Sequence, residues 1–130
     1  MQNFRNVKAW QKAHELVLLI YELTADFPKE ELFGLRTQLR RTAVDIAGYV
    51  AEGSGKPNDE EFAKCVGTAL GFANRIEYFV LVALDLRLIS DEKHVMLNAR
   101  IVEVSKILGG LWKTLRENGR NSIDNYRSAS

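Results

Sequence analysis

Few side chains in this sequence combine the type and the spacing that chemistry requires. The only histidines are His14 and His94, and the only cysteine is Cys65. Zinc sites usually take four Cys or His ligands, and di-iron bundles take repeated Glu-x-x-His pairs, so the sequence predicts no metal site and no cofactor. Asp91 and His94 have a comparable spacing once, at the start of a predicted helix, where acids are expected. The enzymatic alternative is a metal- or nucleotide-dependent hydrolase that uses Asp91, His94 or Glu52.

The segment 53–56, Gly-Ser-Gly-Lys, has the composition of a phosphate-binding loop but not its spacing. A Walker A motif needs glycine at position 50 and Ser or Thr at position 57, where this chain has Val50 and Pro57. Such a loop also follows a strand, whereas a helical pattern precedes this one. We therefore interpret the segment as a helix stop and expect no enzymatic activity.

Charge gives one local signal. Eighteen Lys and Arg against seventeen Asp and Glu leave a net charge of +1, which argues for neither a nucleic-acid nor a membrane partner. The exception is Arg36, Arg40 and Arg41, with no acid between positions 32 and 44. Guanidinium groups bind phosphate oxygens in pairs of hydrogen bonds, so RNA or another nucleic acid is one candidate partner. Acidic residues of a neighbouring helix or subunit are the alternative.

The elements that position these residues are helices. Apolar residues recur three and four positions apart over four stretches, which is typical of amphipathic helices. These stretches are residues 7–24, 32–52, 58–88 and 90–117. Asn58 and Ser90 have side chains suited to cap the last two helices, and the stripe of the last one includes Trp112 and Leu115.

A chain of 130 residues, 46% of them hydrophobic, is long enough for one domain with a core. Short connections make successive helices antiparallel, so the predicted fold is all-α, an up-down-up-down four-helix bundle over residues 1–117. The polar, aperiodic segment 118–130 is predicted to be a mobile tail. A single cysteine, no leader pattern and apolar runs of at most six residues, far below the roughly 20 needed to cross a bilayer, predict a cytoplasmic protein.

Two segments are more apolar than one helix stripe requires. Residues 16–20 and 79–84 are apolar throughout, so they present hydrophobic side chains on more than one side. We expect self-association to cover the surplus, and heterologous packing would close such subunits into a ring. The alternatives are a helix that is central within the monomer and a helix of another protein that covers the surplus. The predicted interface residues are Leu16, Leu18, Leu19, Phe72 and Phe79.

The order of several short motifs resembles a known family. Val7-Lys8-Ala9-Trp10-Gln11-Lys12-Ala13, Phe33-Gly34-Leu35, Gln38-Leu39-Arg40-Arg41-Thr42-Ala43, Ala51-Glu52-Gly53, Glu61-Phe62 and Ala69-Leu70-Gly71 together resemble the 23S ribosomal RNA intervening-sequence proteins over residues 4 to 115. The matched positions outside the arginine patch are Trp10, Gly34, Leu35, Gln38, Glu52, Gly53, Phe62 and Gly71.

The resemblance implies a bacterial four-helix bundle that assembles as a homopentameric ring and has no assigned catalytic activity. This family is similar to the accessory protein of diversity-generating retroelements, which implies nucleic acid or a nucleic-acid enzyme as a partner. Our leading hypothesis is accordingly a non-enzymatic homo-oligomeric scaffold or adaptor that contacts RNA through Arg36, Arg40 and Arg41. The alternative is a module that binds a protein partner and no nucleic acid.

Overall fold

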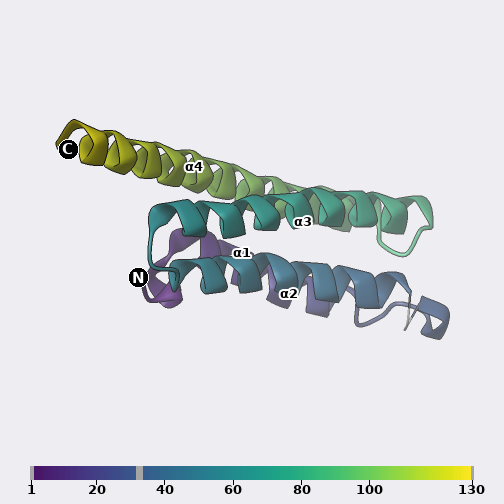
Figure 1. Ribbon diagram of the computed structural model, residues 1–130. Coiled ribbons are helices and arrows are strands. Elements are labelled where there is room, and N and C mark those ends of the chain that lie inside the picture. The colour runs from purple at the N-terminus through teal and green to yellow at the C-terminus, as the bar shows by residue number, and fades with distance from the viewer. Residues whose placement is uncertain (1, 32–33, 130) are drawn as a thin grey trace.

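The computed structural model describes residues 2–31 and 34–129, those from 122 onward by their backbone only. All regular structure in these residues is helical, which confirms the predicted all-α class and the four helices. The helices are α1 (Lys8–Leu23), α2 (Leu35–Ser54), α3 (Asp59–Asp85) and α4 (Asp91–Ala129), with short 3-10 turns at Phe4–Asn6 and Lys29–Glu31 (Figure 1).

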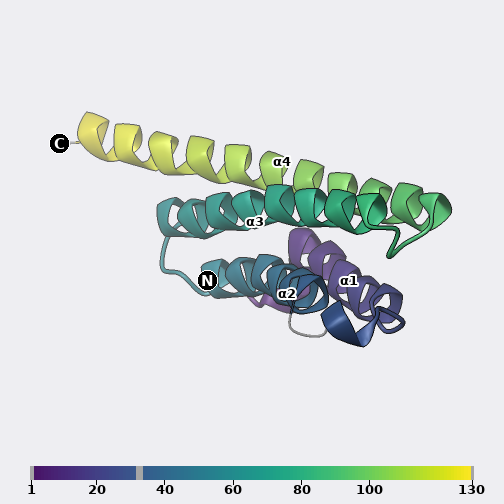
Figure 2. The same ribbon diagram turned by 90° about the vertical axis from the view of Figure 1, so that its right-hand side faces the viewer.

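The helices pack along their lengths. The most extensive contacts join α2 to α3 and α3 to α4, whereas α1 packs mainly on α2 and only lightly on α4. The turn between α3 and α4 lies at the end of the molecule opposite to the connection between α2 and α3 (Figure 1). Viewed from the side, the last part of α4 extends past the start of α3 (Figure 2).

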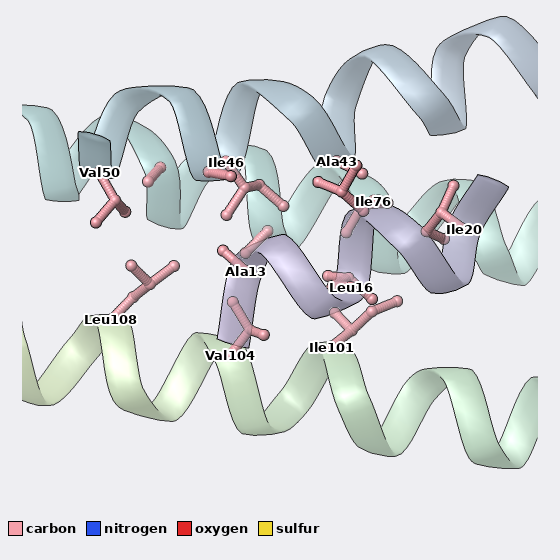
Figure 3. Packing of buried hydrophobic residues seen from close by; sticks show 14 of the residues in the cluster. Ala13, Leu16, Ile20, Ala43, Ile46, Val50, Ile76, Ile101, Val104 and Leu108 are labelled. Atoms are coloured by element: carbon pink, nitrogen blue, oxygen red, sulfur yellow. The ribbon is translucent and has the colours of Figure 1, made fainter. Parts of the chain in front are cut away.

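The core consists of apolar stripes from the four helices, as the spacing predicted, except that Val95 of the predicted α4 stripe is 68% exposed. Small and branched side chains from all four helices meet along the axis of the bundle, and Figure 3 shows part of this cluster. Removing these side chains from water supplies the main free energy of folding, about 25 cal/mol for each Å² of apolar surface. The labelled residues are Ala13, Leu16, Ile20, Ala43, Ile46, Val50, Ile76, Ile101, Val104 and Leu108.

Side-chain caps fix where the helices begin. The Asn58 Oδ1 atom accepts a hydrogen bond from the backbone N–H of Glu61 at 2.9 Å, and Ser90 Oγ accepts one from the N–H of Lys93 at 3.1 Å. Both predicted caps are therefore confirmed. The carboxylate of Glu31 accepts the N–H of Leu35 at 3.0 Å, so α2 begins at Leu35.

The last helix is longer than predicted. We expected it to end at Glu117, but the backbone is helical through Ala129, so that boundary was wrong. The segment contains no proline, and extending an existing helix is far easier than nucleating a new one, so polar composition alone does not end it. The mobility expected for 118–130 stays a prediction, and residue 130 and the side chains from 122 onward lie outside the described residues.

Of the described helices, only α3 is long and apolar enough by composition to cross a membrane. Its apolar side chains form the stripe that packs against the other helices, and the central helix of a bundle meets the same criterion. The buried residues of α3 are Phe62, Ala63, Cys65, Val66, Ala69, Ala73, Ile76, Val80 and Ala83.

Candidate functional site

The arginines predicted as a patch on α2 have three different environments. Arg40 is engaged within the chain: its Nε donates to Thr24 Oγ1 at 2.9 Å and its Nη2 donates to the carbonyl of Tyr21 at 3.0 Å. The guanidinium also lies 4.4 Å from the centre of the Tyr21 ring, a cation–π distance. Arg40 therefore holds α2 against the C-terminal end of α1.

The other two arginines are not held in this way. Arg41 is exposed and has no ion pair within the described chain. Arg36 is half-buried, and its Nε finds no hydrogen-bond acceptor among the residues that the structure describes. The three side chains thus do not form one free cationic surface, because the middle arginine faces α1.

The residues predicted to form the apolar interface also differ in their exposure to solvent. Leu16 is only 2% exposed and belongs to the core, so its assignment to an interface was wrong: it is one of the α1 residues that face the other helices. Leu18 is 59% exposed, and Leu19 is half-buried against the core. Phe72 and Phe79 are half-buried as well, and Phe72 stacks on Tyr49 of α2 with ring centres 5.6 Å apart.

Leu18 and Leu19 line a groove of about 470 Å³ between α1 and α4. Two ion pairs lie along it, since Lys12 lies 3.8 Å from Glu103 and Arg100 lies 3.8 Å from Glu15, and Glu22 adds one further acid. Lys12 is partly buried, but the other three side chains are exposed to solvent, so these pairs contribute little to stability. The groove therefore offers apolar side chains among charged residues that include one more acid than base.

A second groove, of about 410 Å³, lies on the other flank of α4, between α3 and α4. It is lined by Asn74, Glu77, Tyr78, Leu81, His94 and Asn98. Leu81 is 45% exposed, and Tyr78 is more exposed still. Sequence analysis missed these two residues, and the available signal was the position of Leu81 within the apolar run 79–84.

A third cavity, of about 290 Å³, lies between the first turns of α3 and the far end of α4. Trp112 lies in its wall and is 37% exposed. The spacing had placed Trp112 on the core stripe, and this was wrong because α4 faces only the first turns of α3 there, so part of the large indole remains outside.

The residues of the hydrolase alternative are not brought together. Asp91 and His94 lie at the start of α4, and Glu52 lies at the opposite end of the molecule, near the end of α2 (Figure 1). The Glu52 carboxylate instead accepts a hydrogen bond from the Cys65 thiol at 3.7 Å. Burial, and secondarily the negative charge of Glu52, raise the pKa of the Cys65 thiol. No cluster of three His, Cys, Asp or Glu side chains suited to a metal occurs in the described chain.

Several residues that carry the family resemblance have structural roles. Gly53 is buried where α2 meets α3, and a Cβ atom there would lie 2.7 Å from Phe62 Cδ1. The Trp10 ring stacks on His14 at 4.9 Å between centres. Gly34 is the N-cap of α2, directly before the half-buried Leu35. Two others, Gln38 and Gly71, are exposed, and a Cβ atom on Gly71 would meet nothing within 4 Å.

These features define a helical protein whose candidate sites are surfaces and grooves between helices. The chain belongs to the 23S rRNA-intervening sequence protein family, whose model matches residues 5–110. The function of this family is not known. No curated protein matches the chain.

One similar solved structure is the crystal structure of a protein of unknown function from the S23 ribosomal protein family of Bacteroides thetaiotaomicron. It has a TM-score of 0.75 and 23% sequence identity, and the match covers 81% of this chain and 95% of that one. At this identity the similarity supports the fold alone.

Proposed function

We propose that this protein is a non-enzymatic cytoplasmic scaffold or adaptor that works as a homo-oligomer, a pentameric ring of up-down-up-down bundles. The observation that carries the proposal is the exposure of large apolar side chains on all four helices. The core accounts for most of each apolar run, but Leu18 and Leu81 remain exposed. Exposed apolar residues that gather in grooves mark contact sites.

The positions of these two leucines favour a ring. Leu18 lies in the groove between α1 and α4, whereas Leu81 lies in the groove between α3 and α4. One chain therefore presents two different apolar surfaces, on opposite flanks of α4. When one surface of a subunit binds the other surface of the next, the contact is heterologous, and a suitable rotation closes it into a ring.

The mass of the particle in solution tests this proposal. Light scattering should give five times 14.7 kDa and no change on dilution through the micromolar range. A monomer at those concentrations would overturn the proposal and favour the alternative, a module whose apolar grooves bind another protein.

RNA contact through the basic patch of α2 is a second candidate function, and the exposed Arg41 is the observation that favours it. Arg36, five residues away on the helix, points to a different side, and Arg40 is engaged with α1. Arg41→Gln should weaken retention of a structured RNA at low salt, and raising the salt should release the RNA from the parent protein. Equal retention by the variant would reject this candidate.

A further inference from the structure

The cavity beside Trp112 differs from the two grooves in the chemistry of its lining. Its floor is formed by small and apolar residues, and its rim carries three cations and one acid. The floor residues are Ala63, Gly67, Leu115 and Gly119, and the rim residues are Glu60, Lys64, Arg116 and Arg120. The first turns of α3 and the end of α4 contribute to it together.

The indole of Trp112 is partly covered by the chain and 37% of the residue is exposed. A Cβ atom on Gly67 would lie 3.5 Å from the indole Nε1, so the glycine leaves room for the ring against α3. The indole N–H donates no hydrogen bond within the described residues. The ring contact that it makes is with Arg116, whose guanidinium lies 5.2 Å from the ring centre.

The rim is positive because its arginines are unpaired. Lys64 has an acidic neighbour, Glu61, at 3.2 Å. Arg116 and Arg120 have no ion pair in the described part of the chain, and they lie four residues apart on one helix, where like charges repel. The lining of the groove beside Leu18 has one more acid than base, and the groove beside Leu81 carries Glu77 and no Lys or Arg. Of the three, only the Trp112 cavity combines an exposed aromatic ring with excess positive charge.

We propose that this cavity binds one unpaired base of a single-stranded nucleic acid, which stacks on Trp112 while the adjoining phosphates contact Arg116 and Arg120. Proteins hold single strands by this combination of aromatic stacking and cationic contacts to the backbone. An acidic peptide would satisfy the arginines but would offer no flat ring to the indole. A duplex keeps its bases stacked and cannot insert one.

This site is distinct from the arginine patch of α2 and from the surfaces proposed for self-association. Its α4 side comes entirely from residues after 110, where the match to the family model ends. The cavity volume of about 290 Å³ is at the lower limit of ordinary ligand pockets, which suits a single base better than a larger group.

Tryptophan fluorescence tests the proposal directly. The chain has two tryptophans, so Trp10→Phe leaves Trp112 as the only fluorescent indole. Short oligouridylate and oligothymidylate should both quench it to saturation at about 50 mM salt. The affinity should fall as salt rises, and each of Arg116→Gln and Arg120→Gln should reduce the slope of log affinity against log salt by roughly 0.7.

Binding of a fluorescein-labelled strand, followed by anisotropy, separates stacking from charge. Trp112→Leu should weaken it by roughly ten- to a hundredfold, whereas Trp112→Phe, which keeps a stacking ring, should bind within a few fold of the parent. Lys93→Gln removes an exposed cation at the other end of α4, outside the grooves proposed for self-association, and it should leave binding unchanged. Thermal melts of each variant show that it is folded.

Three results would overturn the proposal. They are a lack of quenching by either strand at low salt, equal quenching by a duplex of the same length, and tighter binding of an oligoglutamate than of the nucleic acids. Light scattering on the same samples measures the mass of the particle, so the test of the Trp112 site is independent of the test of the scaffold proposal. A pentamer that does not bind the strands rejects only the Trp112 site, and a monomer that binds them rejects only the ring.

Discussion

Gly53 shows how one residue sets the distance between two helices. A Cβ atom at this position would lie 2.7 Å from Cys65 Cβ and 2.7 Å from Phe62 Cδ1, which is closer than atoms can approach. Alanine favours helices over glycine by about 1 kcal/mol, but crowding in a packed core costs more. We predict that Gly53→Ala lowers the free energy of unfolding by about 1–3 kcal/mol, measured with urea.

Gly48 provides the matched control, because it lies in the same helix and a Cβ atom there would meet nothing within 4 Å. Gly48→Ala should raise the free energy of unfolding by roughly 0.5–1 kcal/mol. If both substitutions stabilise the protein equally, the result would contradict the close contact of α2 with α3 at Gly53.

The contacts of Arg40 indicate that it stabilises the fold. Its side chain donates to Thr24 and Tyr21, and Thr24 is buried. Arg40→Ala should cost about 1.5–3 kcal/mol in urea unfolding, since a hydrogen bond from a charged group is lost and a buried oxygen loses a donor. Arg41→Ala should change stability by less than about 0.5 kcal/mol, as is usual for an exposed position. Equal losses of stability in the two variants would contradict the hydrogen bonds of Arg40 to Thr24 and Tyr21.

Cys65 should make stability depend on alkaline pH. Because its pKa is raised in the folded protein by burial and by Glu52, the unfolded chain ionises first as the pH increases. The stability from this group is therefore complete below the unfolded thiol pKa of about 8.5 and is lost as the pH rises through the folded pKa. The free energy of unfolding, measured with urea at a series of alkaline pH values, should fall further in the parent than in Cys65→Ala. Parallel pH dependence in the two proteins would contradict this prediction.

At the scale of elements, the turn that follows α3 contains the only non-glycine residue with a positive φ among the described residues. Arg87 has a φ of +59°, where glycine is preferred, and the N–H of Leu88 reaches back to the carbonyl of Ala83 at 2.8 Å. The ion pair of Arg87 with Asp91 is exposed and worth little. Arg87→Gly should therefore raise the free energy of unfolding by about 1 kcal/mol, measured by urea titration.

A comparison with Arg87→Ala isolates this effect, because alanine also removes the charge but keeps the left-handed penalty. Alanine should leave stability within about 0.5 kcal/mol of the parent. A stabilisation of the same size by alanine would show that the charge, and not the backbone, is responsible.

At the scale of the whole molecule, two different surfaces predict a specific mixing result. Leu18→Glu should disable one surface and Leu81→Glu the other, and both positions are exposed, so the fold should persist. Each variant alone should be monomeric by light scattering. Mixed in equal amounts, they should form dimers that grow no further, because each variant retains the surface that the other has lost.

Circular dichroism checks that both variants are folded before they are mixed. Monomers that stay monomeric on mixing would contradict the pairing of these two grooves. A variant that still forms the full particle would show that its leucine lies outside the interface.

The sequence by itself determined the helices and much of the core. Three- and four-residue spacing is a local property, and so are the side-chain caps at Asn58 and Ser90. The motifs that carry the family resemblance are also readable along the chain. The sequence did not determine where α4 ends, because a polar segment is compatible both with a solvent-exposed helix and with an irregular chain.

Only the tertiary structure decided which cations and apolar residues are free. Arg40 and Arg41 are neighbours in the sequence, yet one is engaged with α1 and the other is exposed. Leu16 and Leu18 likewise divide between the core and the surface. The physical reason is that spacing gives the direction of a side chain around its own helix, whereas burial depends on which other helix lies in that direction and how closely.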